Sequence, residues 1–277
     1  MYLDVLTLDA RHGESLHMLG VMAHQQGAHA KAVDLISAAI AINDAVAAYH
    51  FHLGLAAQSL GELERARSSY ERAIALQPDF APAHHGLGHI FKSQNQLDHA
   101  VASFRTAHAL KASTAYMYSL AEALLYQRKH VSEALTLLEQ VAAKTPDLHA
   151  VQIGMGNALY ELGRPVEALA AYQRAIEIKP TSLRGHSGYL YTLSRTQLLL
   201  PAEILARARR FQAQTCAPPA KPFVMRAIPT GRRLRIGFLS SEVGTHPVSN
   251  FLESYLRHYD RKGFEVTLYA TAPCAYA

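Results

Sequence analysis

The sequence predicts a mostly α-helical fold, in which a superhelix of stacked helical hairpins is followed by a short β-α-β unit. Two observations support this prediction. A 34-residue pattern of small, aromatic and proline residues recurs between residues 13 and 182, and such a period is typical of helical repeats. Beyond residue 232, two runs rich in branched and aromatic residues flank an amphipathic segment, which is typical of parallel strands joined by a helix.

The repeat is clearest in two segments, HLGLAAQSLGELERARSSYERAIALQPDF (52–80) and IGMGNALYELGRPVEALAAYQRAIEIKPTS (153–182). They align at a spacing of 102 residues, which is three periods of 34. If Leu53 and Gly54 take positions 7 and 8 of a unit, the shared residues fall at positions 8, 15, 20, 24, 27 and 32. These residues are Gly54, Gly61, Ala66, Tyr70, Ala73 and Pro78 in the first segment, and Gly156, Gly163, Ala168, Tyr172, Ala175 and Pro180 in the second.

Three further units follow the same count. The units keep Leu19, Gly20, Gly27, Ala32, Ile36 and Ala39 in 13–46, Leu87, Gly88, Ala100, Phe104 and Ala107 in 81–114, and only Ala134, Leu138 and Pro146 in 115–148.

Each recurring residue type has a physical reason. Small residues at positions 8 and 20 let two helices approach closely, and the large residue at position 24 fills the gap to the next unit. Glycine at position 15 permits the turn between helices, and proline at position 32 ends the second helix. One unit cannot bury its apolar face alone, so neighbours stack. Over residues 13–182 the chain resembles the tetratricopeptide repeat family, and the tyrosines at position 24 are expected in the core.

The remaining segments divide the chain further. Residues 1–12 match the end of a truncated repeat, which indicates a fragment or a late start, and 183–214 read as capping helices, with Pro201 opening the second. Residues 215–232 are rich in proline and read as an extended linker, and 233–277 as an incomplete first lobe of a further domain.

Composition narrows the function classes. No run of 18 apolar residues predicts a membrane span, and the N-terminus lacks an export pattern, so we expect a cytoplasmic protein. Cys216 and Cys274 are too few for a disulfide or zinc framework. Between residues 203 and 235 there are eight basic residues and one acidic residue. This stretch has no base-reading motif, so we expect a solvated connector and no nucleic-acid partner.

Helical repeat arrays bind extended peptides along a concave face formed by the first helix of each unit. Several first helices here carry polar candidates for such a groove: His17, His24, His52, His85, His89 and Asn157. His85 and His89 are spaced like two metal ligands on one helix face, but no third ligand lies near them in the sequence, so no metal is expected. Two interpretations stay open for the histidines. They form a peptide groove that titrates near pH 6.5, or they are ordinary half-exposed polar residues.

The C-terminal segment predicts two strands and a helix. RLRIGFLSS alternates as a buried strand, Pro247 suits the first turn of a helix over 248–259, and FEVTLYAT (264–271) reads as a second strand. Ligands of parallel sheets bind beyond the carboxyl ends of the strands. The loop from Ser240 to His246 is expected at that edge.

The run RRLRIGFLSSEVGTHPVSNFLESYLRHYDRKGFEVTLYA resembles the start of the catalytic region in bacterial members of the O-linked N-acetylglucosamine transferase/SPINDLY family. That family joins tetratricopeptide repeats to a Rossmann-like, two-lobed glycosyltransferase of the GT-B kind. The resemblance implies transfer of a sugar, N-acetylglucosamine foremost, from a nucleotide diphosphate donor to serine or threonine of a protein held by the repeats. It implies no metal or other cofactor.

The resemblance also implies site residues. His246 corresponds to the active-site histidine, which accepts or positions the proton of the acceptor hydroxyl. Ser240, Ser241, Thr245 and Pro247 would shape the same loop. Glu242 and Val243 stand where relatives often carry Asp-Phe, so details of this loop differ.

Two hypotheses remain at this stage. The chain is part of a protein O-glycosyltransferase, or it is an interaction scaffold with a vestigial tail. The donor pocket of the family lies mainly in a second lobe that residues 233–277 do not supply, so we expect the chain alone to be inactive. Pairing of identical copies is left open.

Overall fold

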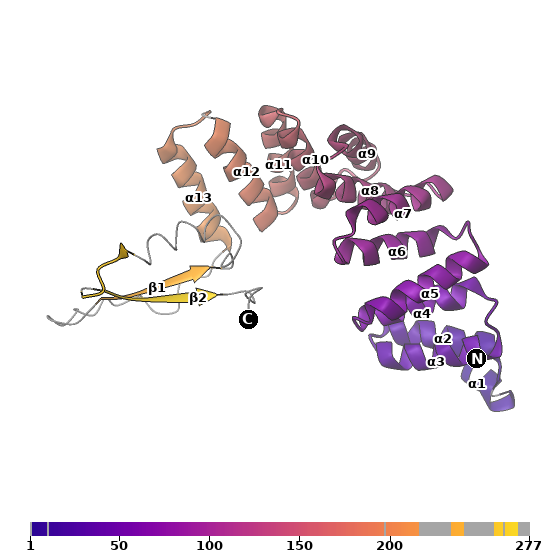
Figure 1. Ribbon diagram of the computed structural model, residues 1–277. Coiled ribbons are helices and arrows are strands. Elements are labelled where there is room, and N and C mark those ends of the chain that lie inside the picture. The colour runs from indigo at the N-terminus through magenta and orange to yellow at the C-terminus, as the bar shows by residue number, and fades with distance from the viewer. Residues whose placement is uncertain are drawn as a thin grey trace. The chain divides into compact units, whose positions relative to one another are not determined.

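The computed structural model describes residues 2–9, 11–196, 198–215, 234–240, 258–262 and 264–270. The chain divides into two compact units, 1–217 and 218–277, which we describe separately (Figure 1).

The described part of the first unit is helical. Its helices are α1 (Tyr2–Leu8), α2 (Gly13–Gln25), α3 (His29–Ile42), α4 (Ala47–Ser59), α5 (Leu63–Leu76), α6 (Ala81–Ser93), α7 (Leu97–Leu110), α8 (Thr114–Gln127), α9 (Val131–Lys144), α10 (His149–Glu161), α11 (Pro165–Ile178), α12 (Leu183–Thr196) and α13 (Pro201–Thr215). We call the even-numbered members from α2 to α12 the first helices and their odd-numbered partners the second helices.

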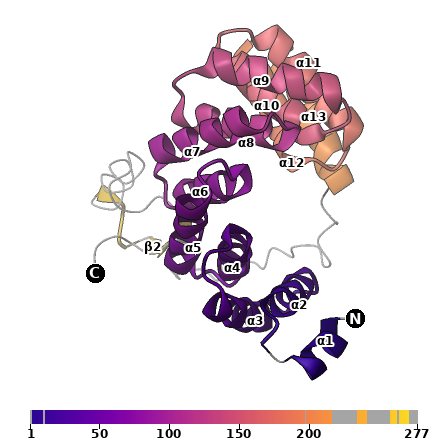
Figure 2. The same cartoon turned by 90° about the vertical axis from the view of Figure 1, so that its right-hand side faces the viewer.

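Each first helix pairs with the second helix that follows it, and each hairpin packs on the next in a curved row (Figures 1 and 2). The predicted superhelix of helical hairpins is therefore confirmed. None of the helices that the structure describes is both long enough and apolar enough to cross a membrane.

One large side chain at position 24 joins each hairpin to the next. Tyr70 of α5 is fully buried, and a Cβ atom added at either Gly54 of α4 or Gly86 of α6 would lie 2.6 Å from its ring. Tyr172 of α11 lies in the same way between Gly156 of α10 and Gly188 of α12, where an added Cβ would lie 2.6 Å and 2.5 Å from its ring. The ring therefore needs glycine on both first helices that it touches.

The turn between the two helices of a unit requires a left-handed residue at position 15. Glycine takes this place three times, with φ between 72° and 80° at Gly27, Gly61 and Gly163. Asn95 takes it in the unit 81–114, with φ of 58°, and in the unit 115–148 the left-handed residue is Arg128, one place earlier, with φ of 54°. The predicted role of glycine in this turn is confirmed, because L-residues with side chains adopt such angles at a cost.

The fourth unit departs from the strict period. Helix α8 begins at Thr114, one residue before the expected 115, because the Ser113 side chain caps it by accepting a hydrogen bond of 3.2 Å from the Tyr116 amide. The eighth residue of α8 is therefore Ala121, which is fully buried as a small residue at this place must be. Glu122 is thereby turned toward the inner face of the row.

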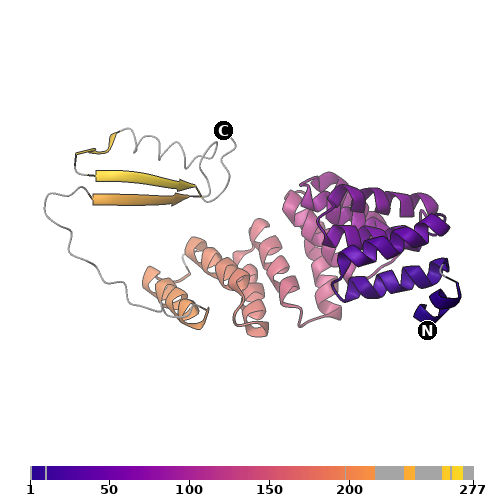
Figure 3. The same cartoon turned by 90° about the horizontal axis from the view of Figure 1, so that it is seen from below.

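In the second unit the structure describes two strands, β1 (Leu234–Ser240) and β2 (Phe264–Ala270). They are parallel, in a register that runs from Leu234 opposite Phe264 to Ser240 opposite Ala270, and their arrows point the same way in Figure 3. Residues 241–257, which hold nearly all of the helix expected between the strands, lie outside the described residues. The Rossmann-like β-α-β unit therefore stays a prediction.

We predict that Gly86→Ala destabilises the array by about 1–3 kcal/mol, because the rigid ring of Tyr70 leaves no room for a methyl group. Gly13→Ala is the control, since the nearest atom to its added Cβ would be at 3.5 Å, an ordinary contact. Urea unfolding followed by far-UV circular dichroism measures both variants. Equal stability of Gly86→Ala and the parent chain would contradict the role given to the ring.

Candidate functional site

The first helices line two cavities on one face of the row. Their second, fifth, ninth and twelfth residues recur at nearly whole turns of the helix, so they share a face. The first cavity, which we call the histidine section, has a volume of about 560 Å³ and is lined by His24, Phe51, Leu55, Gln58, Ser59, Pro82, His85, Gly86, His89 and Tyr116. The second, which we call the tyrosine section, has a volume of about 650 Å³ and is lined by Tyr118, Glu122, Leu125, Tyr126, Arg128, Leu138, Ala150, Ile153, Gly154, Asn157, Tyr160, Glu161, Tyr172, Arg184, Ser187, Gly188 and Tyr191.

Of the six groove candidates predicted from the sequence, His24, His85 and His89 line the histidine section and Asn157 lines the tyrosine section. His17 and His52 line neither cavity and instead contact each other. The Nε2 atom of His17 lies 2.9 Å from Nδ1 of His52, which also lies 2.8 Å from the carbonyl oxygen of Ala48. A carbonyl accepts only, so His52 Nδ1 carries the proton, and Nε2 of His17 must accept. The contact therefore requires a neutral His17.

A second histidine pair lies in the histidine section itself. His85 Nε2 is 2.9 Å from the hydroxyl of Ser119 on α8 and 3.3 Å from Nε2 of His89. Burial first, and the neighbouring His89 second, together lower the pKa of His85 to about 4. Burial, followed by the charge of Lys92, also lowers the pKa of His89. This pair is therefore neutral at physiological pH.

The pKa values of the other three groove histidines, His17, His24 and His52, are also lowered. Burial first, and His52 second, lower the pKa of His17 to about 4. Burial and His29, whose Nδ1 lies 3.2 Å from Nδ1 of His24, lower the pKa of His24. Burial is the largest cause of the lowered pKa of His52. These histidines charge at a more acidic pH than the value near 6.5 that the sequence alone indicated, because desolvation disfavours the charged ring.

Three other histidines have a purely structural geometry. His50, His84 and His186 are each the fourth residue of a first helix, and each donates from Nε2 at 2.9 Å to a carbonyl six residues earlier, in the turn from the preceding unit. The accepting residues are Asp44, Pro78 and Pro180. These three histidines were not predicted from the sequence to have a role, although their spacings of 34 and 102 residues follow the repeat.

A metal centre does not assemble around the spaced pair His85 and His89. Within the described residues, no group of three or more His, Cys, Asp or Glu side chains is placed to hold an ion. The two rings meet nearly perpendicularly, at 86°, and hydrogen-bond to each other.

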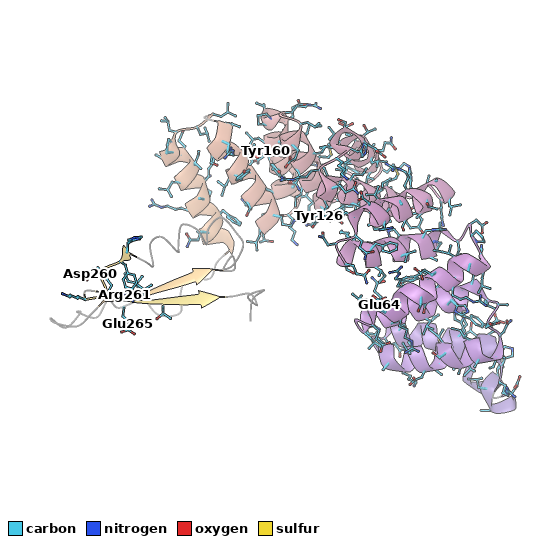
Figure 4. The ribbon with its side chains drawn as sticks, viewed as in Figure 1. Glu64, Tyr126, Tyr160, Asp260, Arg261 and Glu265 are labelled. Carbon is cyan, nitrogen blue, oxygen red and sulfur yellow. The ribbon has the colours of Figure 1, made fainter. Side chains whose placement is uncertain are left out.

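The tyrosine section combines exposed rings with oriented polar groups. The rings of Tyr126 and Tyr191 are 56% and 55% exposed, and Tyr160 meets Tyr191 edge to face at 5.5 Å. Figure 4 marks Tyr126 and Tyr160, which come from the neighbouring first helices α8 and α10. The hydroxyl of the buried Tyr172 donates to Asn157 Oδ1 at 2.7 Å and so orients its amide. Burial raises the pKa of Tyr172 to about 12, so this hydroxyl keeps its proton.

Two ion pairs involve the carboxylates that line the tyrosine section. Lys92 of α6 pairs with Glu122 of α8, and its ammonium lies 5.2 Å from the centre of the Tyr126 ring. Arg128, in the turn after α8, pairs with Glu161 of α10 at 3.0 Å. Both carboxylates that line the tyrosine section are thus paired with a cation.

The predicted catalytic loop is beyond what the structure describes. His246, Ser241, Thr245 and Pro247 lie outside the described residues. Ser240 is the last residue of β1, opposite Ala270 of β2, so it stands at the carboxyl ends of both strands. The catalytic role of His246 and the loop roles stay predictions.

Comparisons with known proteins identify the repeats. Residues 81–114 and 118–182 match profiles described as tetratricopeptide repeat, and residues 58–93 match one described as TPR repeat. A comparison with curated protein sequences gave no significant match. These matches lie within residues 58–182, so the resemblance of the C-terminal segment to a glycosyltransferase stays a prediction.

Solved structures share the helical fold. YrrB, described as a TPR protein with an unusual peptide-binding site, is 22% identical, with a TM-score of 0.58 over 64% of this chain and 92% of its own. PilF of Pseudomonas aeruginosa is 18% identical, with a TM-score of 0.61 over 73% and 89%. MamA is 16% identical, with a TM-score of 0.54 over 68% and 97%. At these identities the likeness shows the fold alone.

We predict that the free energy of unfolding falls as the pH falls from about 6.5 to 4. In that window the unfolded chain binds protons that His17 and His85, with pKa values of about 4, do not bind when folded. The double variant His17→Gln, His85→Gln should lose part of this dependence in urea unfolding at several pH values. The variant of an exposed loop histidine, His130→Gln, should keep it. Parallel pH profiles for the double variant and the parent chain would contradict the prediction.

Proposed function

Because the chain carries a tetratricopeptide repeat array, we propose that it is a binding module that holds an extended peptide segment of a partner protein along its first helices. The observation that supports this function is the row of two cavities, of about 560 and 650 Å³, on one face of successive first helices. The fold is shared with YrrB, whose description names a peptide-binding site. Two cavities that follow one another along a row of helices suit a chain-like ligand better than a compact one.

The chemistry of the lining supports the same proposal. Tyrosine and arginine are enriched at the centres of protein interfaces, because a rigid ring buries much area at a small entropic cost and still offers a hydroxyl. The tyrosine section carries five tyrosines, two arginines and Asn157. An amide oriented by Tyr172 can recognise the backbone of an extended peptide, which presents one donor and one acceptor per residue.

A second candidate is that the array presents a protein substrate to a glycosyltransferase region that begins near residue 233. The parallel pairing of β1 and β2 supports it, because ligands of parallel sheets bind at the edge formed by the carboxyl ends of the strands, where Ser240 stands. By the family resemblance, that region would transfer N-acetylglucosamine from a nucleotide diphosphate donor, with His246 at the acceptor hydroxyl. The same groove would then hold the protein that is modified.

Selection of random linear peptides on the purified full chain tests the binding function. We expect enriched peptides whose affinity drops about tenfold or more in the double variant Tyr160→Ala, Tyr191→Ala, because the groove loses two exposed rings. Tyr2→Ala, on α1 and outside both cavities, should bind as the parent chain does. A selection that yields no binder, or binders insensitive to the groove variant, would argue against a peptide groove.

For the second candidate, we expect the purified chain to bind peptide without transferring sugar. The measurement is incubation with radiolabelled UDP-N-acetylglucosamine and a selected peptide that contains serine, followed by detection of labelled product. His246→Ala is the matched variant. Labelled product that disappears in this variant would overturn the expectation and establish an active transferase within these residues.

A further inference from the structure

The tyrosine section has a surplus of positive charge that its own carboxylates do not neutralise. Glu122 pairs with Lys92, and Glu161 pairs with Arg128, so these four charges cancel in pairs. Arg184 lines the same cavity, is exposed, and has no ion-pair partner among the residues that the structure describes. Arg195, at the other end of the same helix, likewise lacks one within the described residues. Arg184 in the lining, and Arg195 on the same helix outside the lining, are thus two cations without an ion-pair partner among the described residues.

Helix geometry places both arginines on the face that carries the groove. Arg184, Tyr191 and Arg195 are spaced by seven and four residues along α12, which returns to nearly the same side of a helix. The guanidinium of Arg195 lies 5.8 Å from the centre of the Tyr191 ring. Tyr191 in turn lines the cavity beside Arg184. Along α12, the ring of Tyr191 thus has one arginine before it and one after it on the same side of the helix.

The separation of the two arginines sets a minimum size for a ligand. Eleven residues of helix place their Cα atoms about 16 Å apart along the axis. An extended peptide covers that distance with about five residues. A ligand that pairs a separate acidic group with each arginine is therefore expected to carry two acidic groups about this far apart.

Resting on the proposed peptide-binding function, we propose that the tyrosine section selects extended peptide segments with at least two acidic residues, through Arg184 and Arg195. Carboxylates match guanidinium groups in geometry as well as charge. The ring of Tyr191, with Tyr160 edge to face beside it, would pack against the side chains between the acidic residues. The histidine section does not share this preference, because its groove histidines are neutral at physiological pH.

A nucleic acid fits the same section less well. Its phosphates follow one another continuously and would need a run of cations, whereas the cavity lining holds two arginines, of which Arg128 is already paired with Glu161. The cavity also has apolar lining at Ile153 and Leu125. An unpaired arginine in the lining, a second one on the same helix, and aromatic and apolar residues in the same cavity match the mixed chemistry of a peptide.

The test starts from a random linear peptide library selected on the full chain at physiological ionic strength. We expect Asp and Glu to be enriched, and Lys and Arg depleted, relative to the unselected library. The strongest peptide, labelled with fluorescein, is then titrated by fluorescence anisotropy. The double variant Arg184→Glu, Arg195→Glu should raise its Kd at least tenfold. Replacing the acidic residues of the peptide by Asn and Gln should do the same to its binding by the parent chain.

The matched control is the double variant Arg209→Glu, Arg210→Glu on α13. It changes the net charge by the same amount at two exposed arginines that line neither cavity, and it should change Kd less than twofold. Equal losses in the two double variants would overturn the inference, because the effect would then come from the overall charge of +5. Circular dichroism confirms that each variant is folded.

The outcomes separate this inference from the function on which it rests. Enriched peptides without an excess of acidic residues, whose binding still depends on Tyr160 and Tyr191, would overturn the inference and leave the peptide groove standing. A library that yields no binder would overturn both. Competition of the peptide by single-stranded oligothymidylate at a similar affinity would overturn the inference in favour of nucleic acid.

Discussion

The structure depends on one contact that recurs in every unit, a large side chain at position 24 inserted between two successive first helices. Tyr70, Phe104 and Tyr172 occupy this place as rings, and Ile36 and Leu138 as aliphatic side chains. Each needs a small residue at the eighth place of its own first helix, and Tyr70, Leu138 and Tyr172 also meet a glycine at the sixth place of the next one. Because this contact fixes how closely successive first helices pack, it also decides which of their residues face the groove.

Hydrogen-bonded histidines occur in the N-terminal repeats where the sixth residue of the next first helix is not glycine. The sixth residues of α4 and α8 are His52 and Ser119. Each is hydrogen-bonded to the fifth residue of the preceding first helix, His17 in one case and His85 in the other. A buried polar side chain needs such a partner. His17 and His85 therefore provide hydrogen-bond partners for the polar sixth residues. Their burial between the first helices is the main cause of their low pKa values.

Much of the fold could be predicted from the sequence because the residue types that each hairpin needs recur at the same positions in several units. The turn glycines, the large residue at position 24 and the end of each second helix all recur. The one-residue shift of α8 was not predicted, although Ser113 is a good capping residue and Ala112 stands where three other units have proline. The glycines at the sixth place, Gly86, Gly154 and Gly188, also recur at multiples of 34 and were overlooked.

The candidate site was predicted less completely, because its chemistry arises between helices. The sequence placed Asn157 and the histidines on the inner face. It could not show that His17 faces His52, or that Lys92 neutralises Glu122, because such pairs form only when successive first helices pack. The arginines of α12 were overlooked for a simpler reason: the repeat pattern weakens after Pro180, so their place on the groove face was hidden.

The most direct test of this account is a crystal structure of the full chain with the strongest peptide selected from a random library. The account predicts that the peptide lies extended in the tyrosine section, along α12 between Arg184 and Arg195, in contact with Tyr160 and Tyr191. A peptide bound to the second helices, or only to residues beyond 217, would contradict it.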